Sequence, residues 1–174
     1  MPHYVALLRG INVGRHRRIG MADLRRALEA LGYEGVRTLG QSGNVVLDAP
    51  SEAAVARDVA KAAGMDLEVV VRTPRQLAAV VDRDPFGDVA DDPRLYLVHF
   101  LSGKPSAAAV KALRDADVGE ERFTAHGREL YTWHPGGQQR SPLAKLVAGA
   151  DLGVTVTNRN WNTVTKLLEL ARAS

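Results

Sequence analysis

The sequence predicts an α+β fold made of two consecutive βαββαβ halves, each a ferredoxin-like antiparallel sheet with helices on one face, followed by an extra C-terminal helix. Three observations lead to this fold class. Short apolar runs and helical patterns occur in the same order twice along the chain. A turn-rich stretch over 85–93 separates the two series. The 174 residues are enough to bury a full core, as one large domain or as two small ones.

Hydrophobic periodicity and capping residues define the elements of the first half. Apolar residues at helical spacing, from Met21 to Leu31, predict a helix that ends at Gly32. Ser51 is a typical N-cap and Gly64 a typical C-cap for a second helix. In order, we expect a strand at 4–9, a helix at 21–32, hairpin strands at 36–39 and 45–47, a helix at 52–63 and a strand at 67–71.

The same order recurs after a short connecting helix predicted over 74–84. The expected elements are a strand at 95–101, a helix at 106–116, strands at 121–126 and 129–133 joined at Gly127, a helix at 142–149, a strand at 152–156 and a final helix at 161–172. Residue identities do not repeat, so the repeat is one of element order. We therefore predict an N-terminal half at 1–73, a connecting helix and linker at 74–93, and a C-terminal half with the final helix at 94–174.

This topology predicts which loops meet. In a βαββαβ unit the first and second strands are parallel, and the third strand pairs with the first. The loop after the first strand, Gly10–Gly14, should therefore lie at the same sheet end as the hairpin turn Ser42–Asn44. In the second half, residues 134–137 and 157–160 should share one end by the same reasoning.

Composition narrows the class of protein. The chain is 45% hydrophobic, and no apolar run approaches the roughly 18 residues of a membrane span. Its start, Met1-Pro2-His3-Tyr4, lacks the features of a signal peptide, so we expect a cytoplasmic protein with no membrane partner. The absence of cysteine excludes disulfides, thiol catalysis and cysteine-ligated metal.

The basic character of the chain is concentrated in one loop. Removing the four charges of Arg9, Arg15, Arg17 and Arg18 from the formal net charge of +3 leaves −1. Guanidinium groups bind phosphate or carboxylate in a bidentate manner, and glycines let backbone N–H groups approach an anion. The glycine spacing matches no known nucleotide-binding motif. We therefore predict a loop that binds a small anion.

Two amide-rich motifs resemble this loop in their polar character, Gln41-Ser42-Gly43-Asn44 and Thr157-Asn158-Arg159-Asn160. Asn158 or Asn160 is expected to cap the final helix, with Trp161 in the core and Arg159 exposed. Because ligand clefts form preferentially at domain interfaces, we expect the Arg9 loop and the start of the final helix to face one shared cleft, with Arg9 and Arg159 contributing to a common anion site. The predicted ligand-binding residues are Arg9, Gly10, Asn12, Gly14, Arg15, Gln41, Ser42, Asn44, Arg159 and Asn160.

Four separated motifs resemble one known family. They are Ala6-Leu7-Leu8-Arg9-Gly10-Ile11-Asn12-Val13-Gly14, Met21-Ala22-Asp23-Leu24-Arg25, Gln41-Ser42-Gly43-Asn44-Val45-Val46, and Arg159-Asn160-Trp161-Asn162-Thr163-Val164 with Lys166-Leu167. In their order they resemble domain-of-unknown-function family 1697 (DUF1697), a group of mostly bacterial proteins, from residue 5 to about 170. The resemblance implies a duplicated ferredoxin-like fold and no established activity.

Three functions stay open at this point. The leading prediction is binding of a small anionic ligand that bears phosphate or carboxylate. The first alternative is a hydrolase or transferase acting on such a ligand, with Arg159 stabilising charge and His134 as acid or base. No catalytic or metal-binding motif is present, so we assign no catalytic residue, no metal and no cofactor. The second alternative is nucleic-acid binding, against which the scarcity of aromatic residues counts.

Overall fold

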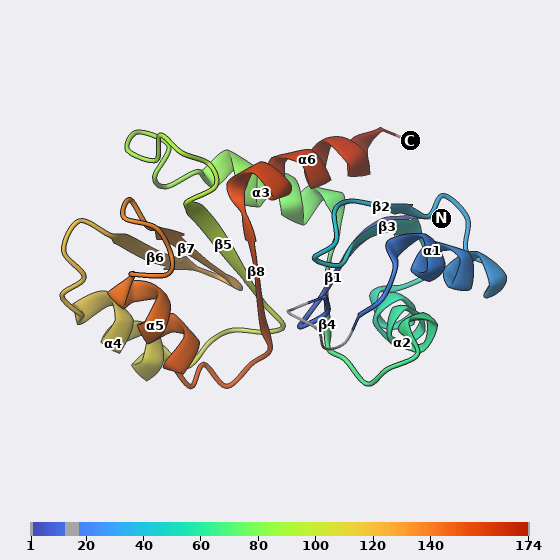
Figure 1. Ribbon diagram of the computed structural model, residues 1–174, viewed down its shortest axis with the longest axis horizontal. Helices are drawn as coiled ribbons and strands as arrows, with labels where there is room; N and C mark the ends of the chain where they lie inside the picture. The colour runs from blue at the N-terminus through green and yellow to red at the C-terminus, as the bar shows by residue number, and fades with distance from the viewer. Residues whose placement is uncertain (1, 13–17, 174) are drawn as a thin grey trace. The chain divides into compact units, whose positions relative to one another are not determined.

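The computed structural model describes residues 2–12 and 18–173. The chain forms two compact units, one of residues 1–79 with 165–174 and one of residues 80–164. Each unit contains a four-stranded antiparallel sheet, with strand orders β2-β3-β1-β4 and β6-β7-β5-β8 (Figure 1). In both sheets the first strand of the unit pairs with the third and the fourth, which confirms the predicted duplicated ferredoxin-like fold.

The first unit has the predicted βαββαβ order. Its elements are β1 (His3–Leu8), α1 (Met21–Ala30), β2 (Arg37–Thr38), β3 (Asn44–Asp48), α2 (Glu52–Ala63) and β4 (Val69–Arg72), followed in the chain by α3 (Pro74–Arg83). The predicted caps of α2 are confirmed. The Ser51 hydroxyl accepts a hydrogen bond from the backbone N–H of Ala54, and Gly64 ends the helix with a φ of 69°.

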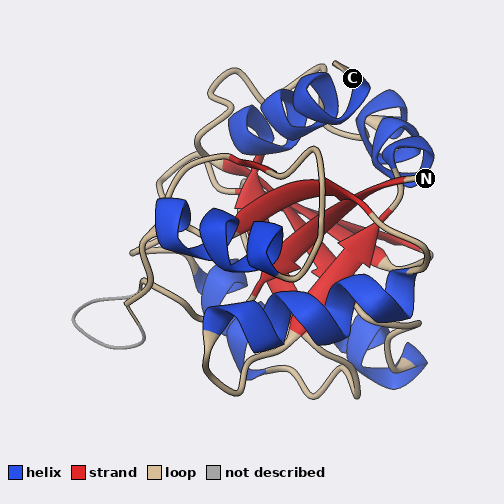
Figure 2. Ribbon diagram, turned by 90° about the vertical axis from the view of Figure 1, so that its right-hand side faces the viewer, coloured by secondary structure: helices blue, strands red, loops and turns tan. Residues whose placement is uncertain are grey.

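Helices α1 and α2 cover one face of the first sheet (Figure 2). The side chains between sheet and helices are aliphatic, such as Leu8 of β1, Leu28 of α1 and Val59 of α2, and each is completely buried. Alternate residues of each strand and residues three or four apart on each helix supply this core. Apolar side chains of the sheet therefore pack on those of the two helices.

The second unit repeats the order. Its elements are β5 (Tyr96–Leu101), α4 (Ala107–Asp115), β6 (Arg122–His126), β7 (Glu129–Trp133), α5 (Pro142–Gly149) and β8 (Val156–Asn160), after which α6 (Trp161–Arg172) begins. Helices α4 and α5 lie on one face of the sheet, over a core that includes Leu101, Leu130 and Leu143 (Figure 1). Ser106 and Ser141 cap these two helices through their hydroxyl groups.

The last strand differs from the prediction. We expected it at 152–156 with a loop after it, but β8 begins at Val156 and runs to Asn160. The apolar run at 152–156 is not a strand at its start. Its first residue, Leu152, is instead buried in the core with residues of α4 and α5. Pairing with β5 decides the outcome, because Leu101 lies opposite Val156 and Leu97 opposite Asn160. The polar motif 157–160 is therefore part of the sheet.

The predicted meeting of loops is confirmed for the described residues of the first unit, and in the second unit it holds for His134 and Asn160 only, because 157–159 lie along β8. The backbone N–H of Leu8 donates to the carbonyl of Gly43 at 2.8 Å, which joins the end of β1 to the hairpin. In the second unit, Tyr96 at the start of β5 lies opposite Trp133, and the next residue lies opposite Asn160. The ends of β7 and β8 therefore share one end of the sheet.

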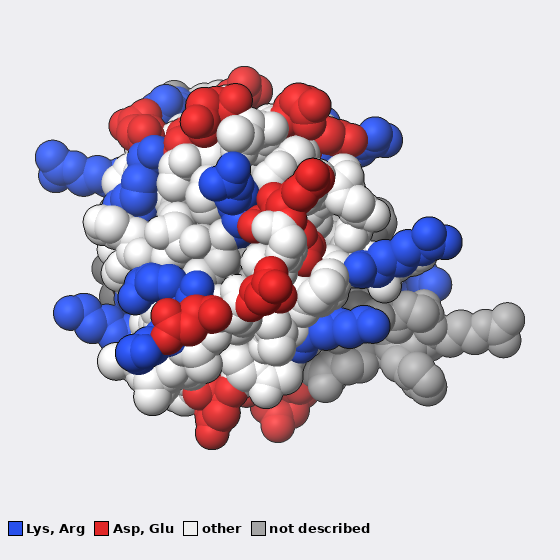
Figure 3. Space-filling model, turned by 90° about the vertical axis from the view of Figure 1, so that its left-hand side faces the viewer, with Lys and Arg blue, Asp and Glu red and all other residues white. Residues whose placement is uncertain are grey.

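Basic and acidic side chains are interspersed on the face seen in Figure 3, so no broad area of one sign covers it. Within residues 2–12 and 18–173, no helix combines the length and the apolar character that crossing a membrane requires.

Candidate functional site

The loop after β1 is fastened to the hairpin tip by one side chain. The amide nitrogen of Asn12 donates to the carbonyl of Gln41 at 2.7 Å and to that of Ile19 at 3.0 Å, and its amide oxygen accepts from the backbone N–H of Ile19 at 2.9 Å. Asn12 has a φ of 54°, a left-handed conformation that asparagine tolerates better than most residues. Its side chain therefore sets the geometry of the loop.

Gly43 allows the hairpin to approach this loop closely. Its φ is +91°, and a Cβ atom at this position would lie 2.8 Å from Cβ of Leu8 and 2.9 Å from Cδ1 of Ile11. These separations are too short for carbon atoms that are not bonded to each other. Only glycine fits here, and the tip therefore packs directly on the start of the loop.

Arg9 and Gly10 lie at a cavity of about 370 Å³, whose walls also contain Asp66, Leu67 and Glu68. The Arg9 guanidinium is 3.4 Å from the Glu68 carboxylate, and both side chains are about half exposed. Exposed pairs of this kind contribute little free energy. An anionic group can therefore replace Glu68 as the partner of Arg9.

The other predicted residues of the first unit divide into exposed and supporting ones. Gln41 and Ser42 are exposed at the hairpin tip, beside the loop that carries Arg9. Asn44 is buried, and its amide donates to the carbonyl of Leu39 at 2.8 Å and to the Ser42 hydroxyl at 3.0 Å. Asn12 and Asn44 thus hold the two loops in shape. Gly14 and Arg15 lie outside the described residues.

In the second unit, Asn160 caps α6, because its side-chain oxygen accepts from the backbone N–H of Thr163 at 2.9 Å. The expectation that Arg159 is exposed is wrong, since only 6% of it is accessible. Its position in β8, opposite Val98, places it on the face of the sheet that α4 and α5 do not cover. Its guanidinium donates to the Thr157 hydroxyl and to the Asn158 carbonyl, both at 2.7 Å, and burial lowers its pKa to about 10.

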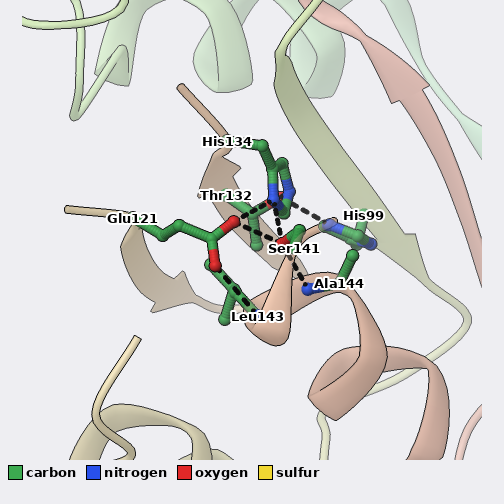
Figure 4. Close-up of polar contacts among 7 residues, drawn as sticks. All are labelled: His99, Glu121, Thr132, His134, Ser141, Leu143 and Ala144. Atoms are coloured by element: carbon green, nitrogen blue, oxygen red, sulfur yellow. Dashed lines mark hydrogen bonds and ion pairs between the residues drawn. The ribbon is translucent and has the colours of Figure 1, made fainter. Parts of the chain in front are cut away.

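A buried polar network lies between the second sheet and α5 (Figure 4). The Thr132 hydroxyl is 2.9 Å from Nε2 of His99 and 2.7 Å from Nε2 of His134. Nδ1 of His134 is 2.9 Å from the Glu121 carboxylate and 2.8 Å from the Ser141 hydroxyl. We call the series His99, Thr132, His134 and Glu121 the histidine relay. Its members can pass a proton or a change of hydrogen-bond direction from one to the next.

Glu121 is the charged end of the relay. One carboxylate oxygen accepts from Ser141 and His134, and the other accepts from the backbone N–H of Leu143 at 3.0 Å. Burial by itself would raise the pKa of Glu121, but the hydrogen bonds from Ser141, Leu143 and His134 together hold its pKa below the ordinary value. The carboxyl group is therefore ionised at neutral pH.

His99 stands at the other end. Burial, together with the nearby His134, lowers the pKa of His99 to about 3, so its ring is neutral at neutral pH. The relay thus joins a neutral, buried imidazole to an ionised carboxylate.

A second cavity, of about 630 Å³, adjoins the relay where Glu121 forms part of its wall together with Trp133 and Pro135. Sequence reasoning named His134 as an acid or base but missed Glu121, which looks like an ordinary charged residue before an exposed strand. No local pattern marks it. The described residues contain no group of three or more histidines and carboxylates arranged to hold a metal ion.

Comparisons with known proteins address the family and the fold. The family model described as "Protein of unknown function (DUF1697)" matches residues 1–131. No protein of curated function matches the sequence. The structure of the conserved bacterial protein SP0830 from Streptococcus pneumoniae is similar, with a TM-score of 0.79 and 19% identity over 98% of this chain and 99% of that chain. At this identity the likeness concerns the fold alone.

Proposed function

This chain belongs to the DUF1697 family of proteins of unknown function, and from the geometry of its first unit we propose that it binds a small anionic ligand in the cytoplasm. The proposed site lies at the end of the first sheet where Arg9 and Gly10 follow β1 and where Gln41 and Ser42 form the hairpin tip. Asn12 and Asn44 position these loops.

One observation carries the proposal. The Asn12 amide and the Leu8 backbone tie the Arg9 loop to the hairpin, at 2.7 Å and 2.8 Å. Exposed guanidinium, amide and hydroxyl groups of Arg9, Gln41 and Ser42, from segments about thirty residues apart, therefore belong to the same end of the first sheet. Such groups bind phosphate or carboxylate oxygens.

The cavity beside Arg9 narrows the ligand class. Asp66 and Glu68 in its wall repel a second anionic group, but carboxylates accept hydrogen bonds from hydroxyl groups. A ligand with one anionic group and several hydroxyls matches both parts of the wall. Sugar phosphates and nucleoside monophosphates have this composition.

The test is a thermal-shift screen with ribose 5-phosphate, nucleoside monophosphates, inorganic phosphate and simple carboxylates. A ligand present at about 100 times its dissociation constant adds about 2.7 kcal/mol to the free energy of unfolding. For a chain of this size, that raises the melting temperature by several degrees. Titration calorimetry then measures the affinity of each positive compound.

The decisive variant is Arg9→Gln, with Arg25→Gln as its control. Arg25 on α1 is also about half exposed and also faces a glutamate, Glu29, at 3.7 Å. We expect Arg9→Gln to weaken binding about ten-fold or more, because a hydrogen-bonded ion pair with the ligand is lost, and Arg25→Gln to leave it unchanged. Equal effects of the two substitutions would contradict the proposal.

Nucleic-acid binding by the same loop is distinguished by salt. With about four phosphate contacts, the logarithm of the affinity for an oligonucleotide would fall against the logarithm of salt with a slope of about −3 to −4. A steep slope with an oligonucleotide, and no response to sugar phosphates, would favour that alternative. An enzyme acting on the anionic ligand would instead consume it during the titration.

A further inference from the structure

The second strand of each unit lies at one edge of its sheet, and the two edges differ. β2 is two residues long, and its first residue, Arg37, donates hydrogen bonds to the carbonyls of Leu170 and Ala173 at the end of the chain. β6 is five residues long, from Arg122 to His126 (Figure 1). The edge of the first sheet is therefore short and lies beside the end of α6, whereas the edge of the second sheet is a full strand.

The hydrogen bonds at both ends of β7 show which of its residues face β6. The backbone N–H of Leu101 donates to the carbonyl of Arg128 at 2.9 Å, and the N–H of His134 donates to the carbonyl of Leu95 at 3.0 Å. Arg128 and His134 flank β7, so the even-numbered residues of this strand face β5. Successive residues of an antiparallel strand direct their backbone groups to opposite sides. The odd-numbered residues of β7 therefore face β6.

Strand register then gives the direction of each backbone group in β6. The residues opposite the odd-numbered ones of β7 are Arg122, Thr124 and His126, so their N–H and carbonyl groups face β7. Those of Phe123 and Ala125 point away from the sheet. Within residues 2–12 and 18–173, no turn or loop segment forms a backbone hydrogen bond with them. The edge of β6 thus presents donors and acceptors to an additional strand.

β6 lacks most of the features by which sheets avoid pairing with other chains. Edge strands are often interrupted by proline or by a β-bulge. β6 contains neither proline nor glycine, and its pairing with β7 is continuous from Arg122, opposite Trp133, to His126, opposite Glu129. The remaining protective feature is charge, which also determines the kind of strand that can be added.

The charge of β6 favours a partner strand with acidic side chains. Arg122 and His126 are exposed at the two ends of β6, which has no acidic residue. On the neighbouring strand, Glu129 is already paired with Arg83 at 3.6 Å. Glu120 lies in the turn before β6, outside the paired stretch. Oppositely charged side chains on adjacent strands stabilise their pairing, so acidic residues opposite Arg122 complement this edge.

A second copy of the chain complements the edge less well. Antiparallel pairing of β6 with itself about Thr124 would place Arg122 opposite His126, so that no opposite charges meet. In a strand with alternating acidic and apolar residues, the acidic ones lie on the side of Arg122. The apolar ones then lie beside Phe123 and Ala125, which pack on the core under α4 and α5.

We propose that the edge of β6 binds an extended segment of a partner protein, with acidic side chains at alternate positions, as an added antiparallel strand. Main-chain hydrogen bonds to Phe123 and Ala125 provide the affinity, and Arg122 selects the acidic side chains. This surface belongs to the second unit, and its occupation does not depend on the anion site at Arg9.

The test uses the acetylated and amidated peptide Glu-Val-Glu-Val-Glu-Val-Glu, titrated into the ¹⁵N-labelled full chain with assigned backbone signals. We expect the N–H signals of Phe123 and Ala125 to move downfield and their hydrogen exchange to slow, because both groups gain a hydrogen bond. The N–H of Thr124 faces β7 and should change less. The same peptide with lysine in place of glutamate should bind more weakly, because it brings positive charge to Arg122.

Two variants separate the backbone from the charge. Ala125→Pro removes an outward N–H and no bond to β7, and proline is tolerated at such edge positions. It should weaken binding of the glutamate peptide about ten-fold or more, because the ring also obstructs the added strand. Arg122→Gln should weaken it about three-fold, as expected for an exposed ion pair. Arg25→Gln, on the exposed side of α1, should leave it unchanged.

Several results would overturn the proposal. They are unchanged N–H signals of Phe123 and Ala125, equal binding of the glutamate and lysine peptides, and full affinity in Arg122→Gln or in a folded Ala125→Pro variant. Sedimentation of the chain without peptide tests the other occupant. A dimer that Ala125→Pro dissociates would assign the edge to a second copy of the chain.

Discussion

Asn12 and Gln41 are joined by a hydrogen bond of 2.7 Å from the side-chain amide of the first to the backbone carbonyl of the second, across 29 positions of sequence. Replacing Asn12 by alanine removes this bond and those to Ile19, and places alanine at a φ of 54°. We expect a loss of about 2 kcal/mol in the free energy of unfolding, measured by urea denaturation. Asn12→Gly, which tolerates the positive φ, should lose about 1 kcal/mol less. Variants as stable as the parent would show that the bond does not hold the loop.

Gly43 and Gly40 offer a matched pair in the same hairpin. A methyl group at Gly43 would press on Leu8 and Ile11, whereas at Gly40, also with positive φ, nothing lies within 4 Å. Gly40→Ala should cost about 1 kcal/mol from backbone strain alone. Gly43→Ala should cost about 1–3 kcal/mol more, because the core must move to accept the added carbon. Thermal unfolding followed by circular dichroism measures both, and equal losses would disprove the close approach.

Buried His99 should make the protein sensitive to acid. Its pKa of about 3 in the folded state lies below the ordinary value of 6.5, so the unfolded chain binds the proton first as pH falls. The contribution of neutral His99 to the free energy of unfolding is fully present above pH 6.5. It is lost progressively as the pH falls to 3, by up to about 1.4 kcal/mol per pH unit. Glu121, whose pKa is also lowered, adds a loss in the same direction below its ordinary value of 4.5.

Denaturation by urea at pH 7, 6, 5 and 4 measures this dependence. His99→Gln removes the titrating ring and should flatten the curve between pH 6 and pH 4. His126 is exposed at the end of β6, so His126→Gln should leave the curve unchanged. A steep loss that persists in His99→Gln would assign the acid sensitivity to other groups.

The burial of Arg159 predicts a structural cost on truncation. Arg159→Ala deletes a nearly inaccessible side chain and its bonds to Thr157 and Asn158. We expect a loss of about 2–4 kcal/mol, since core truncations fall in this range. Arg114→Ala, on the exposed side of α4, should stay within about 0.5 kcal/mol of the parent. If Arg159→Ala lost as little stability as Arg114→Ala, the Arg159 side chain would not be buried as described.

The candidate sites show where sequence reasoning succeeds. The nearness of the Arg9 loop to the hairpin followed from the order βαββαβ alone, because that order determines which strand ends meet. The supporting role of Asn12 and Asn44 could not be foreseen, since an amide that binds a ligand and one that binds a backbone carbonyl look the same in a sequence.

The amino-acid sequence by itself determined the order of the helices and strands and the duplicated topology, because periodicity, Ser51, Ser141 and the turn glycines act within a few residues of the chain. Only the tertiary structure decided the register of β8, and with it the burial of Arg159, because pairing with β5 links segments about sixty residues apart. The same holds for Glu121. Its contact with His134 arises where two strands and the start of α5 converge, and the donors found there hold a partly buried carboxyl group in its ionised form.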